Sequence, residues 1–342
     1  MSASLGVDPM ANNEKKSLPL VSIIIDNYNY GRFIQDAIES ALNQTYPNIE
    51  VIVVDDGSTD NSREIISRYA SAGVVKAVLK ENGGQASAMN AGFQISRGDL
   101  VMFLDSDDVL KPQAIEAAVK AWHPGVSKIQ WRLEGVDAEL RPTGMSYPPA
   151  GRRMPSGNLR TLVNRWLEYT APPQSGNAYS RAFLDQAMPM PEMDFLMGAD
   201  VPLGLASPFF GLIVSVDKVL GYYRRHKQYN MNRALSDVRL RLTTISAVKR
   251  YLENVVPGLK LPTYSGVSEE RYIMIYCAIE RCGGFTYFKK LSLGLRGAMD
   301  SLVFPFFKTG RKRILSALWF ITIGVLPRKL AKPLAIKGLP DI

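Results

Sequence analysis

The acidic run Asp105-Ser106-Asp107-Asp108 carries the clearest chemical pattern in the sequence. Two aspartates one residue apart at the end of a strand point their carboxylates into the same loop, where hard oxygen atoms can hold a divalent cation. Mg²⁺ or Mn²⁺ held in this way keeps open positions that the oxygens of substrate phosphates fill. Asp105 and Asp107 therefore predict a metal site that serves a nucleotide diphosphate. A turn that caps the helix expected near Pro112 is the structural alternative.

The loops Asn27-Tyr28-Asn29 and Asp55-Asp56-Gly57-Ser58 carry groups that suit a flat nucleotide base. The ring of Tyr28 can stack on a base, and the carboxylate of Asp56 can accept a hydrogen bond from the imide of uracil or thymine. The second loop also suits the N-cap of the following helix, but that structural role does not use both leading aspartates. The two loops therefore favour a uridine or thymidine nucleotide.

The glycine pair Gly83-Gly84 marks a fourth polar loop. Glycine lets the backbone approach a ligand closely, and Gln85, Ala88 and Asn90 then lie on or near the first turns of a helix. The amide groups at the start of that helix suit a phosphate or a sugar. Taken alone, this short pattern is also typical of an ordinary loop.

Four apolar runs must position these loops, and each run is followed by a polar or glycine-containing loop and a helix-like segment. This alternation predicts βαβ units and a mainly parallel sheet. Ligands bind such a sheet at the edge formed by the carboxyl ends of the strands, which is where all four polar loops fall. The predicted strands are Val21–Asp26, Ile49–Asp55, Val74–Leu79 and Leu100–Asp105.

The second half of the chain breaks this alternation, so we expect the sheet to become mixed. Lys128–Asp137 is typical of an antiparallel strand or hairpin, with a turn at Pro142-Thr143-Gly144. A helix is expected at about Leu159–Glu168, and a further strand at Leu212–Val216. From Asn230 onward the pattern is mostly helical, so we place a domain boundary near residue 235.

The length allows one large domain or one domain with an appendage, and the composition is ordinary for a folded globular protein. We expect a flexible polar leader over residues 1–17, an α/β domain over residues 18–235 and a helical C-terminal region over residues 236–342. The net charge of +9 is concentrated beyond residue 280, so we expect no nucleic-acid partner. Cys277 and Cys282 are too few for a disulfide framework, and no Cys/His cluster has zinc spacing, which fits a reducing cytoplasm.

The order of the four loops is more specific than any one motif. They read Val-Ser-Ile-Ile-Ile-Asp-Asn-Tyr-Asn-Tyr, Val-Val-Asp-Asp-Gly-Ser-Thr-Asp, Asn-Gly-Gly-Gln-Ala-Ser-Ala-Met-Asn and Phe-Leu-Asp-Ser-Asp-Asp. Over about residues 18 to 232 the chain resembles the family 2 glycosyltransferases of the GT-A fold. The resemblance implies a Rossmann-like α/β fold for nucleotide-diphospho-sugar transfer, with a mixed sheet flanked by helices and a helical appendage after it.

The resemblance also implies the reaction: an inverting transfer of a sugar from a nucleotide diphosphate, with UDP- and dTDP-sugars favoured. The implied acceptor is a hydroxyl of a saccharide or of a lipid-linked molecule, in the synthesis of cell-surface polysaccharide or glycan. The implied cofactor is Mn²⁺ or Mg²⁺, with Asp105 near the ribose and the metal and Asp107 as metal ligand. The nucleotide contacts implied by matching positions are Asn27, Tyr28, Asn29, Asp56, Gly84, Gln85, Asn90, Asp105 and Ser106.

Inversion by a single displacement needs a general base that takes the proton of the acceptor hydroxyl. In the family this carboxylate lies at the start of a helix that faces the donor. Gly198-Ala199-Asp200-Val201-Pro202-Leu203 resembles that segment and makes Asp200 the expected base. The usual preceding Glu is replaced by Ala199, which keeps Asp194 and Glu192 as rivals. An N-cap is the structural alternative for Asp200.

Two further segments match secondary positions of the family. Tyr222-Tyr223-Arg224-Arg225-His226 resembles a Tyr-Arg-x-His segment, in which Arg224 and His226 approach the metal or the diphosphate. A lone histidine is more often structural, so only the motif position favours this role. Ser175-Gly176-Asn177 resembles an acceptor-side loop, with a simple turn as the equal alternative; it contributes Ser175 and Asn177 as secondary contacts.

The C-terminal region joins apolar runs to basic clusters. Leu302–Phe307 and Leu315–Leu326 are apolar, and Lys308–Arg313 and Arg328–Lys332 flank them. The longest run falls well short of the roughly twenty residues that span a bilayer, so the pattern favours an interfacial helix on anionic lipids. We therefore expect a cytoplasmic protein with a peripheral contact at the inner face of the plasma membrane. Packing on the catalytic domain and a dimer contact are the alternatives.

The strongest rival enzyme class is a haloacid-dehalogenase-type phosphatase, because the strand that ends at Asp105, with Asp107 after it, also resembles its nucleophile motif. That family places the motif on its first strand, whereas three predicted strands precede it here and Asp108-Val109 follows. A non-catalytic sugar-nucleotide-binding protein is the second alternative, supported by Ala199 and opposed by the retained Asp pair.

Asp26 departs from the family pattern, because many relatives have proline or a neutral residue at this position. We expect the Asp26 carboxylate only to form a hydrogen bond with a local backbone amide.

Overall fold

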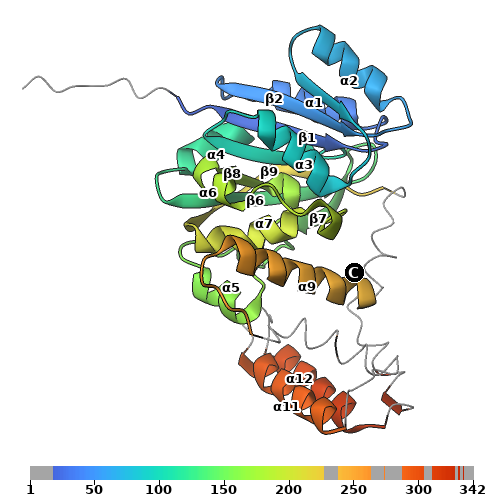
Figure 1. The fold of residues 1–342 in the computed structure, drawn as a ribbon, viewed down its shortest axis with the longest axis vertical. Coiled ribbons are helices and arrows are strands. Elements are labelled where there is room, and N and C mark those ends of the chain that lie inside the picture. Colours follow the sequence, from blue (N-terminus) through green and yellow to red (C-terminus); the bar gives the residue numbers. More distant parts are fainter. Residues whose placement is uncertain are drawn as a thin grey trace, which may run out of the picture.

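The computed structural model describes residues 18–226, 238–262, 287–303 and 310–327, with positions 273, 330, 331 and 334. These residues form a nine-stranded sheet with helices on both faces, and two C-terminal helices lie at the end of the molecule away from β1–β3 (Figure 1). The strands are β1 Val21–Asn27, β2 Ile49–Asp56, β3 Lys76–Lys80, β4 Leu100–Asp105, β5 Val109–Leu110, β6 Val126–Val136, β7 Pro142–Tyr147, β8 Asn177–Ser180 and β9 Leu212–Arg224. The helices are α1 Ile34–Leu42, α2 Ser62–Ser71, α3 Gln85–Ile95, α4 Ala114–Ala121, α5 Arg160–Trp166, α6 Arg181–Ala187, α7 Asp200–Ala206, α9 Val238–Val255, α11 Tyr287–Val303 and α12 Gly310–Val325, with 3₁₀ turns η1 Gln174–Gly176, η2 Glu192–Asp194 and η3 Ser207–Phe209.

The sheet has the order β3-β2-β1-β4-β8-β6-β9-β5, with β7 paired to β6. The first four strands are parallel, as the βαβ pattern predicts. β8 then runs antiparallel to both β4 and β6, and β9 runs parallel to β6, so the prediction of a mixed sheet is confirmed. The parallel half brings the ends of β1, β2 and β4 to one edge.

The structure corrects several predicted boundaries. Pro142-Thr143-Gly144 is not a turn but the start of β7; the chain turns over Asp137–Arg141 instead. There the Asp137 carboxylate accepts hydrogen bonds from the amides of Glu139 and Arg141, at 3.0 and 2.9 Å, which closes the turn before the proline. Pro142 is tolerated because it is the first residue of its strand. β9 runs on to Arg224 rather than ending at Val216 because its second half pairs with β5 and β6.

Two apolar cores lie on opposite faces of the sheet, because successive side chains of a strand alternate between faces. Ile23 and Ile25 of β1 join one core with α1, α2 and α4. Ile24 joins the other core with α3, α6 and α7, and α9 packs there through residues that include Tyr251 and Leu252. The helix after the expected domain boundary thus joins the core of the α/β body, whereas residue 235 itself lies outside the described residues.

The C-terminal helices α11 and α12 pack on each other. In the described part of the chain, no helix combines the length and the apolar character that crossing a bilayer requires. The basic segments at 308–309 and 328–329 and the leader at 1–17 lie outside the described residues.

The close approach of α3 to the sheet gives a stability prediction. A Cβ atom added at Gly92 would clash with Cγ2 of Ile24 and lie 3.1 Å from Cγ2 of Val54. Overpacking of this kind costs about 1–3 kcal/mol, which exceeds the gain of about 1 kcal/mol that alanine brings to a helix. We expect Gly92→Ala to lower the free energy of unfolding in urea by about 1 kcal/mol.

Gly204 of α7 is the matched control, because a Cβ there meets its first neighbour at 3.7 Å. Gly204→Ala should leave stability unchanged or raise it, since the propensity gain acts without a clash. Equal effects of the two substitutions would contradict this account of how α3 packs.

Candidate active site

The parallel register collects the predicted loops at one edge of the sheet. Asp26 at the end of β1 pairs in register with Asp105 at the end of β4, and Asn27 pairs with Asp55 of β2. The loops that follow these strands therefore start side by side, although they are far apart in the sequence. The edge is the one predicted from the strand pattern, with the acidic run at its centre.

A buried amide bridges the first two carboxylates. Nε2 of Gln174 donates to Oδ1 of Asp26 at 2.8 Å and to Oδ1 of Asp105 at 2.7 Å. Nε2 of Gln85 adds longer contacts to the same carboxyl groups, at 3.4 and 3.3 Å. Asp26 thus bonds two glutamine side chains, rather than only the local backbone amide that the sequence suggested. Gln174 was not predicted, because its role depends on a register that the sequence does not show.

The other two aspartates of the run have separate partners. Oδ2 of Asp107 lies 2.9 Å from Nε2 of His226, and the ring of His226 packs on Phe33. Asp108 is buried and accepts a hydrogen bond from the backbone amide of Arg224 at 2.9 Å. The structure therefore brings His226 to the acidic run, as the motif position suggested, and gives Asp108 a structural partner.

Arg224 itself points elsewhere. Its side chain is buried, donates to Oδ2 of Asp36 at 2.6 Å and to the carbonyl of Ala138 at 2.9 Å, and lies over the ring of Phe33. These contacts tie β9 to α1. A direct diphosphate contact by this guanidinium stays a prediction, and it would compete with the ion pair to Asp36.

Asp26, Asp105, Asp107 and Asp108 form an acidic cluster, and the side chains around it do not balance all of its negative charge. Burial raises the pKa of Asp26 to about 7, with a further rise caused by the charge of Asp107. Burial also raises the pKa of Asp105 well above its usual range, and the charges of Asp26, Asp108 and Asp107 add to that rise. Within the described residues, no three Asp, Glu, His or Cys side chains converge in the geometry of a complete ion site. A cation here would need oxygens from a bound ligand.

The carboxylate that was expected to contact the base, that of Asp56, connects the loop after β2 to the loop before α3. Oδ1 of Asp56 accepts from Nζ of Lys80 at 2.6 Å and from the amide of Gly83 at 3.0 Å, and Oδ2 accepts from the amide of Gly84 at 2.7 Å. Both oxygens are thus engaged, and a base contact by Asp56 would require one of these bonds to open. Tyr28 is exposed at the rim, where its ring is accessible.

Several other predicted contacts are engaged inside the protein. Nδ2 of Asn27 donates to Asp55 and Ser58, and Oδ1 of Asn29 accepts from the amide of Thr59. Asn90 exchanges two hydrogen bonds with the backbone of Met190. These side chains shape the rim, and their contact with a nucleotide stays a prediction.

The 174–177 turn supports the acidic run rather than opening to solvent. Oγ of Ser175 accepts from the amide of Asp105 at 3.2 Å, and Nδ2 of Asn177 donates to the carbonyl of Pro173 at 2.7 Å. Ser175, Asn177 and Ser106 are all buried. Both side chains make contacts inside the protein, and an acceptor contact by Ser175 or Asn177 stays a prediction.

Asp200 begins α7 beside this cluster. The carbonyl Oε1 of Gln85 accepts from the amide of Ala199 at 3.1 Å, while the amide of the same side chain faces Asp105, and the charge of Asp200 helps to raise the pKa of Asp105. The two alternative candidates for the base have partners elsewhere. Asp194 forms an ion pair with Arg250 at 3.0 Å, and Glu192 accepts a hydrogen bond from Asn90 at 3.3 Å. Of the three carboxylates, Asp200 is the one placed next to the acidic run.

A buried lysine lies under α7 and was missed by the sequence interpretation. Nζ of Lys128, on β6, donates to Oη of Tyr169 at 3.0 Å, and that hydroxyl donates to the carbonyl of Gly204 at 2.8 Å. Burial lowers the pKa of Lys128 to about 7. Burial raises the pKa of Asp200, and the charge of Lys128 acts against that rise. The sequence around Lys128 gives no sign of burial beyond its place in an apolar strand.

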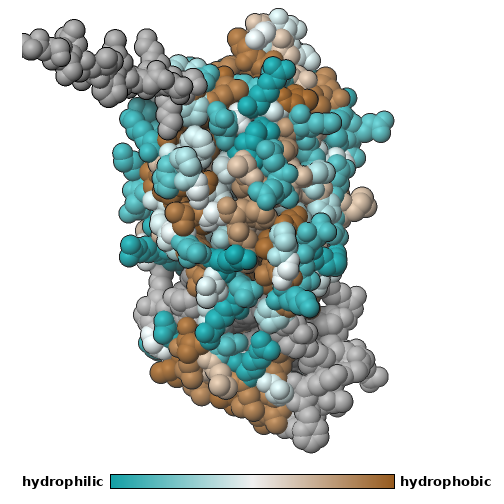
Figure 2. Space-filling model, turned by 60° about the vertical axis from the view of Figure 1, so that its left-hand side comes forward, coloured by the Kyte–Doolittle hydropathy of each residue, from teal (hydrophilic) through white to brown (hydrophobic). Residues whose placement is uncertain are grey.

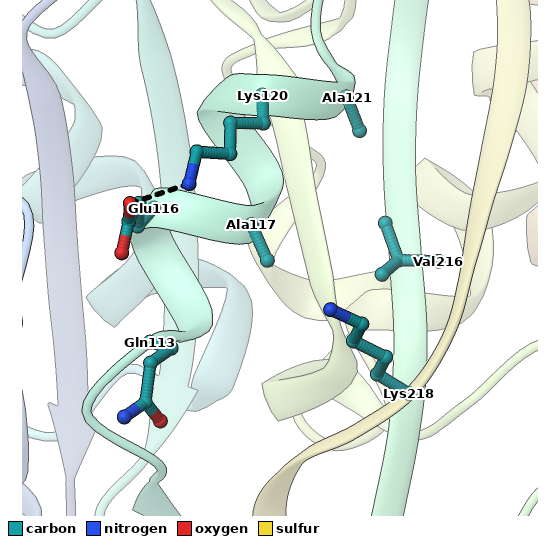
Figure 3. A pocket seen from close by; sticks show the side chains of 7 residues that line it. All are labelled: Gln113, Glu116, Ala117, Lys120, Ala121, Val216 and Lys218. Atoms are coloured by element: carbon teal, nitrogen blue, oxygen red, sulfur yellow. Dashed lines mark hydrogen bonds and ion pairs between the residues drawn. The ribbon is translucent and has the colours of Figure 1, made fainter.

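A pocket of about 380 Å³ between α4 and β9 is separate from this site (Figure 3). Glu116 and Lys120 of α4 form an ion pair at its wall, and Val216 and Lys218 of β9 face them. None of the predicted site residues lines it. The rim of the parallel sheet therefore remains the candidate active site.

Sequence comparison identifies the relatives of this chain. The profile of glycosyl transferase family 2 matches residues 22–184. An uncharacterized glycosyltransferase of Nostoc sp. is 36% identical over 222 residues, which cover 63% of this chain and 68% of that protein. Chondroitin synthase of Pasteurella multocida is 43% identical over 113 residues, which cover 33% of this chain and only 12% of that enzyme.

Structural comparison gives the fold. TarS of S. aureus, solved in complex with UDP-GlcNAc, has a TM-score of 0.55 at 18% identity, covering 89% of this chain and 90% of that chain. The mannosyltransferase PcManGT of Pyrobaculum calidifontis, solved in complex with GDP-Man and Mn²⁺, has a TM-score of 0.50 at 15% identity, covering 94% and 85%. The predicted GT-A fold is confirmed. Given the matched profile and the Nostoc relative, the chain belongs to glycosyl transferase family 2, and it is a glycosyltransferase.

Proposed function

We propose that this glycosyltransferase moves a sugar, with inversion, from a nucleotide diphosphate donor to an acceptor hydroxyl at the rim of the parallel sheet. The observation that carries the proposal is the position of Gln85, whose amide contacts Asp105 while its carbonyl oxygen holds the amide next to Asp200. The Gln85 side chain thereby connects Asp105, the carboxylate proposed to lie at the donor, with the segment that carries Asp200, the candidate base. Single-displacement transfer needs such an arrangement.

A divalent cation, Mn²⁺ or Mg²⁺, is the proposed cofactor. Asp107 and His226 would hold it, with Asp105 beside them, and the donor diphosphate would complete its oxygen ligands, as is usual for these ions. Bound there, the ion would neutralise charge that develops on the leaving diphosphate. The crowding of Asp26, Asp105, Asp107 and Asp108 supports this assignment, because a cation relieves their mutual repulsion. The Mn²⁺ in the Pyrobaculum structure is consistent with it.

The proposed base is Asp200. Its carboxylate takes the proton of the acceptor hydroxyl as that oxygen attacks the anomeric carbon, and the bond from that carbon to the diphosphate oxygen breaks with its electron pair. Burial raises the pKa of Asp200 and so makes its carboxylate a stronger base near neutral pH. The GT-A fold and the three strands before Asp105 leave the phosphatase alternative without support.

The donor and acceptor are proposed by class. Exposed Tyr28 supports stacking on a base, and UDP- or dTDP-sugars remain the favoured donors. Similarity to a chondroitin synthase favours a saccharide acceptor in polysaccharide synthesis. The basic, apolar C-terminal region favours a lipid-linked acceptor at the inner face of the plasma membrane as the second class.

The metal assignment predicts the outcome of a donor screen. UDP-, dTDP- and GDP-sugars with Mn²⁺ or Mg²⁺ should include a pair that raises Tm, because a ligand that binds only the folded state stabilises it. At a hundred times its Kd, such a ligand contributes about 2.7 kcal/mol. Asp107→Ala should remove the part of this shift that depends on the metal.

The matched control is Asp185→Ala, which removes an exposed carboxylate on α6 whose ion pair to Arg181 spans 3.7 Å. It should bind the donor like the wild type. Metal-dependent donor binding that survives in Asp107→Ala would contradict the proposed ligand.

The base assignment predicts a separation of binding from transfer. Asp200→Asn should keep the donor Kd, because the metal side is intact, and lower kcat by about 10²–10⁴-fold, because the proton acceptor is lost. Isothermal titration and product assays measure the two effects. Asp194→Asn, which breaks only the ion pair to Arg250, should keep kcat.

The reverse result, with transfer lost in Asp194→Asn and kept in Asp200→Asn, would move the base to Asp194. Donor binding with no transfer in the wild type, whatever acceptor is supplied, would favour the non-catalytic alternative.

The lysine under α7 predicts a shift in the pH profile. Lys128 is charged below pH 7, since its pKa is about 7, and that charge lowers the pKa of Asp200. A base works when ionised, so kcat/KM should rise with pH through the pKa of Asp200. Lys128→Met removes the charge and should move this rise to higher pH. Lys218→Met, the same change at an exposed site, should leave the profile in place.

A further inference from the structure

The pairing of α11 with α12 uses small residues. A Cβ atom at Gly294 would lie 3.0 Å from Cα of Gly324, and one at Gly297 would clash with the ring of Phe320. Oγ of Ser301 lies 2.9 Å from Oγ of Ser316, and both serines are buried. These pairs run in opposite directions along the two helices, so α11 and α12 form an antiparallel hairpin whose backbones are in close contact.

Leu293, Phe320 and Ile323 are buried in this hairpin, whereas most of its large apolar side chains face outward. On α11 they recur at i, i+4 and i+7, and on α12 at i, i+4, i+7 and i+11, so each set forms one stripe on its helix. Figure 2 shows hydrophobic side chains gathered over the lowest part of the molecule, where Figure 1 places the hairpin. The stripes, from 40% to 71% exposed, are Leu295, Met299, Leu302, Ile314, Leu318, Ile321 and Val325.

The outward placement of most large apolar side chains is the reverse of what water favours. In water, a helix buries its large apolar stripe against the rest of the protein, and contiguous exposed apolar patches mark interaction sites. Helices in lipid pack through glycine, alanine and serine, because their large side chains gain nothing by leaving an apolar solvent. A seam in which glycine and serine bring the backbones together beside Phe320, with most of the leucine, isoleucine and methionine side chains outside, therefore matches a lipid environment.

The charge of the same segment complements an anionic surface. Between residues 287 and 334, Asp300 is the only acidic residue. The basic residues of that segment are Lys289, Lys290, Arg296, Lys308, Arg311, Lys312, Arg313, Arg328, Lys329 and Lys332. A second copy of the chain would bring the same positive charge to the contact, whereas anionic phospholipid headgroups would neutralise it.

We propose that the α11–α12 hairpin lies flat in the headgroup region of an anionic bilayer, with its outer apolar stripes in the acyl boundary. The helices have 17 and 16 residues, about 25 Å of length, which is less than the roughly 30 Å hydrocarbon core. Basic residues occur near both ends of the hairpin, and a hairpin that entered tip first would have to bury those at its tip. The proposal deepens the membrane location within the proposed function.

Vesicle sedimentation of the full chain, without donor or acceptor, tests this contact apart from catalysis. The wild type should sediment with phosphatidylcholine vesicles that contain phosphatidylglycerol, and more weakly with phosphatidylcholine alone. Met299→Asn with Leu318→Asn should weaken partitioning by on the order of tenfold per substitution. Arg311→Gln with Lys312→Gln should weaken it by roughly fivefold per charge, and only on anionic vesicles.

Val74→Asn with Leu140→Asn is the matched control, because both side chains are exposed and apolar but lie on the α/β body. It should sediment like the wild type. Circular dichroism and the donor-induced rise in Tm check that each variant folds. Binding unchanged in both hairpin variants would overturn the proposal. So would a wild type that ignores anionic vesicles and sediments in the ultracentrifuge as a dimer, which Met299→Asn with Leu318→Asn dissociates.

Discussion

Repulsion between carboxylates at the ends of two paired strands is the constraint on which the rest of the site depends. Register places Asp26 beside Asp105, and burial strengthens the interaction between like charges. The amide of Gln174 reduces this repulsion in part, because it donates hydrogen bonds to both carboxyl groups. The negative charge that remains supports the proposed divalent cation, which would in turn attract the diphosphate of the donor.

The same edge shows how a few polar side chains connect loops that follow different strands. Asp56 ties the loop after β2 to Lys80 and to the glycine pair before α3. Gln85, the first residue of α3, then reaches both Asp105 and the start of α7. Residues that resemble ligand contacts in the family are thus also the internal bonds of the rim, so their substitution would disturb the positions of their neighbours.

The α/β body and the α11–α12 hairpin differ in which apolar side chains they bury. The sheet buries isoleucine, valine and phenylalanine between layers of helices, as expected for a core formed in water. The α11–α12 hairpin instead brings Gly294 and Gly324 together and leaves Met299 and Leu318 outside. This difference in what is buried distinguishes the α/β body from the surface that we propose for lipid.

The sequence alone determined the family, the parallel half of the sheet and the edge that holds the candidate site, because strand alternation and loop motifs are local patterns. The motif position also suggested that His226 approaches the metal or the diphosphate, and the structure places it beside Asp107. Only the tertiary structure decided the partners of Asp26, the burial of Lys128 and the internal engagement of Arg224. Those contacts join residues far apart in the chain through strand register and helix packing, which local residue patterns do not encode.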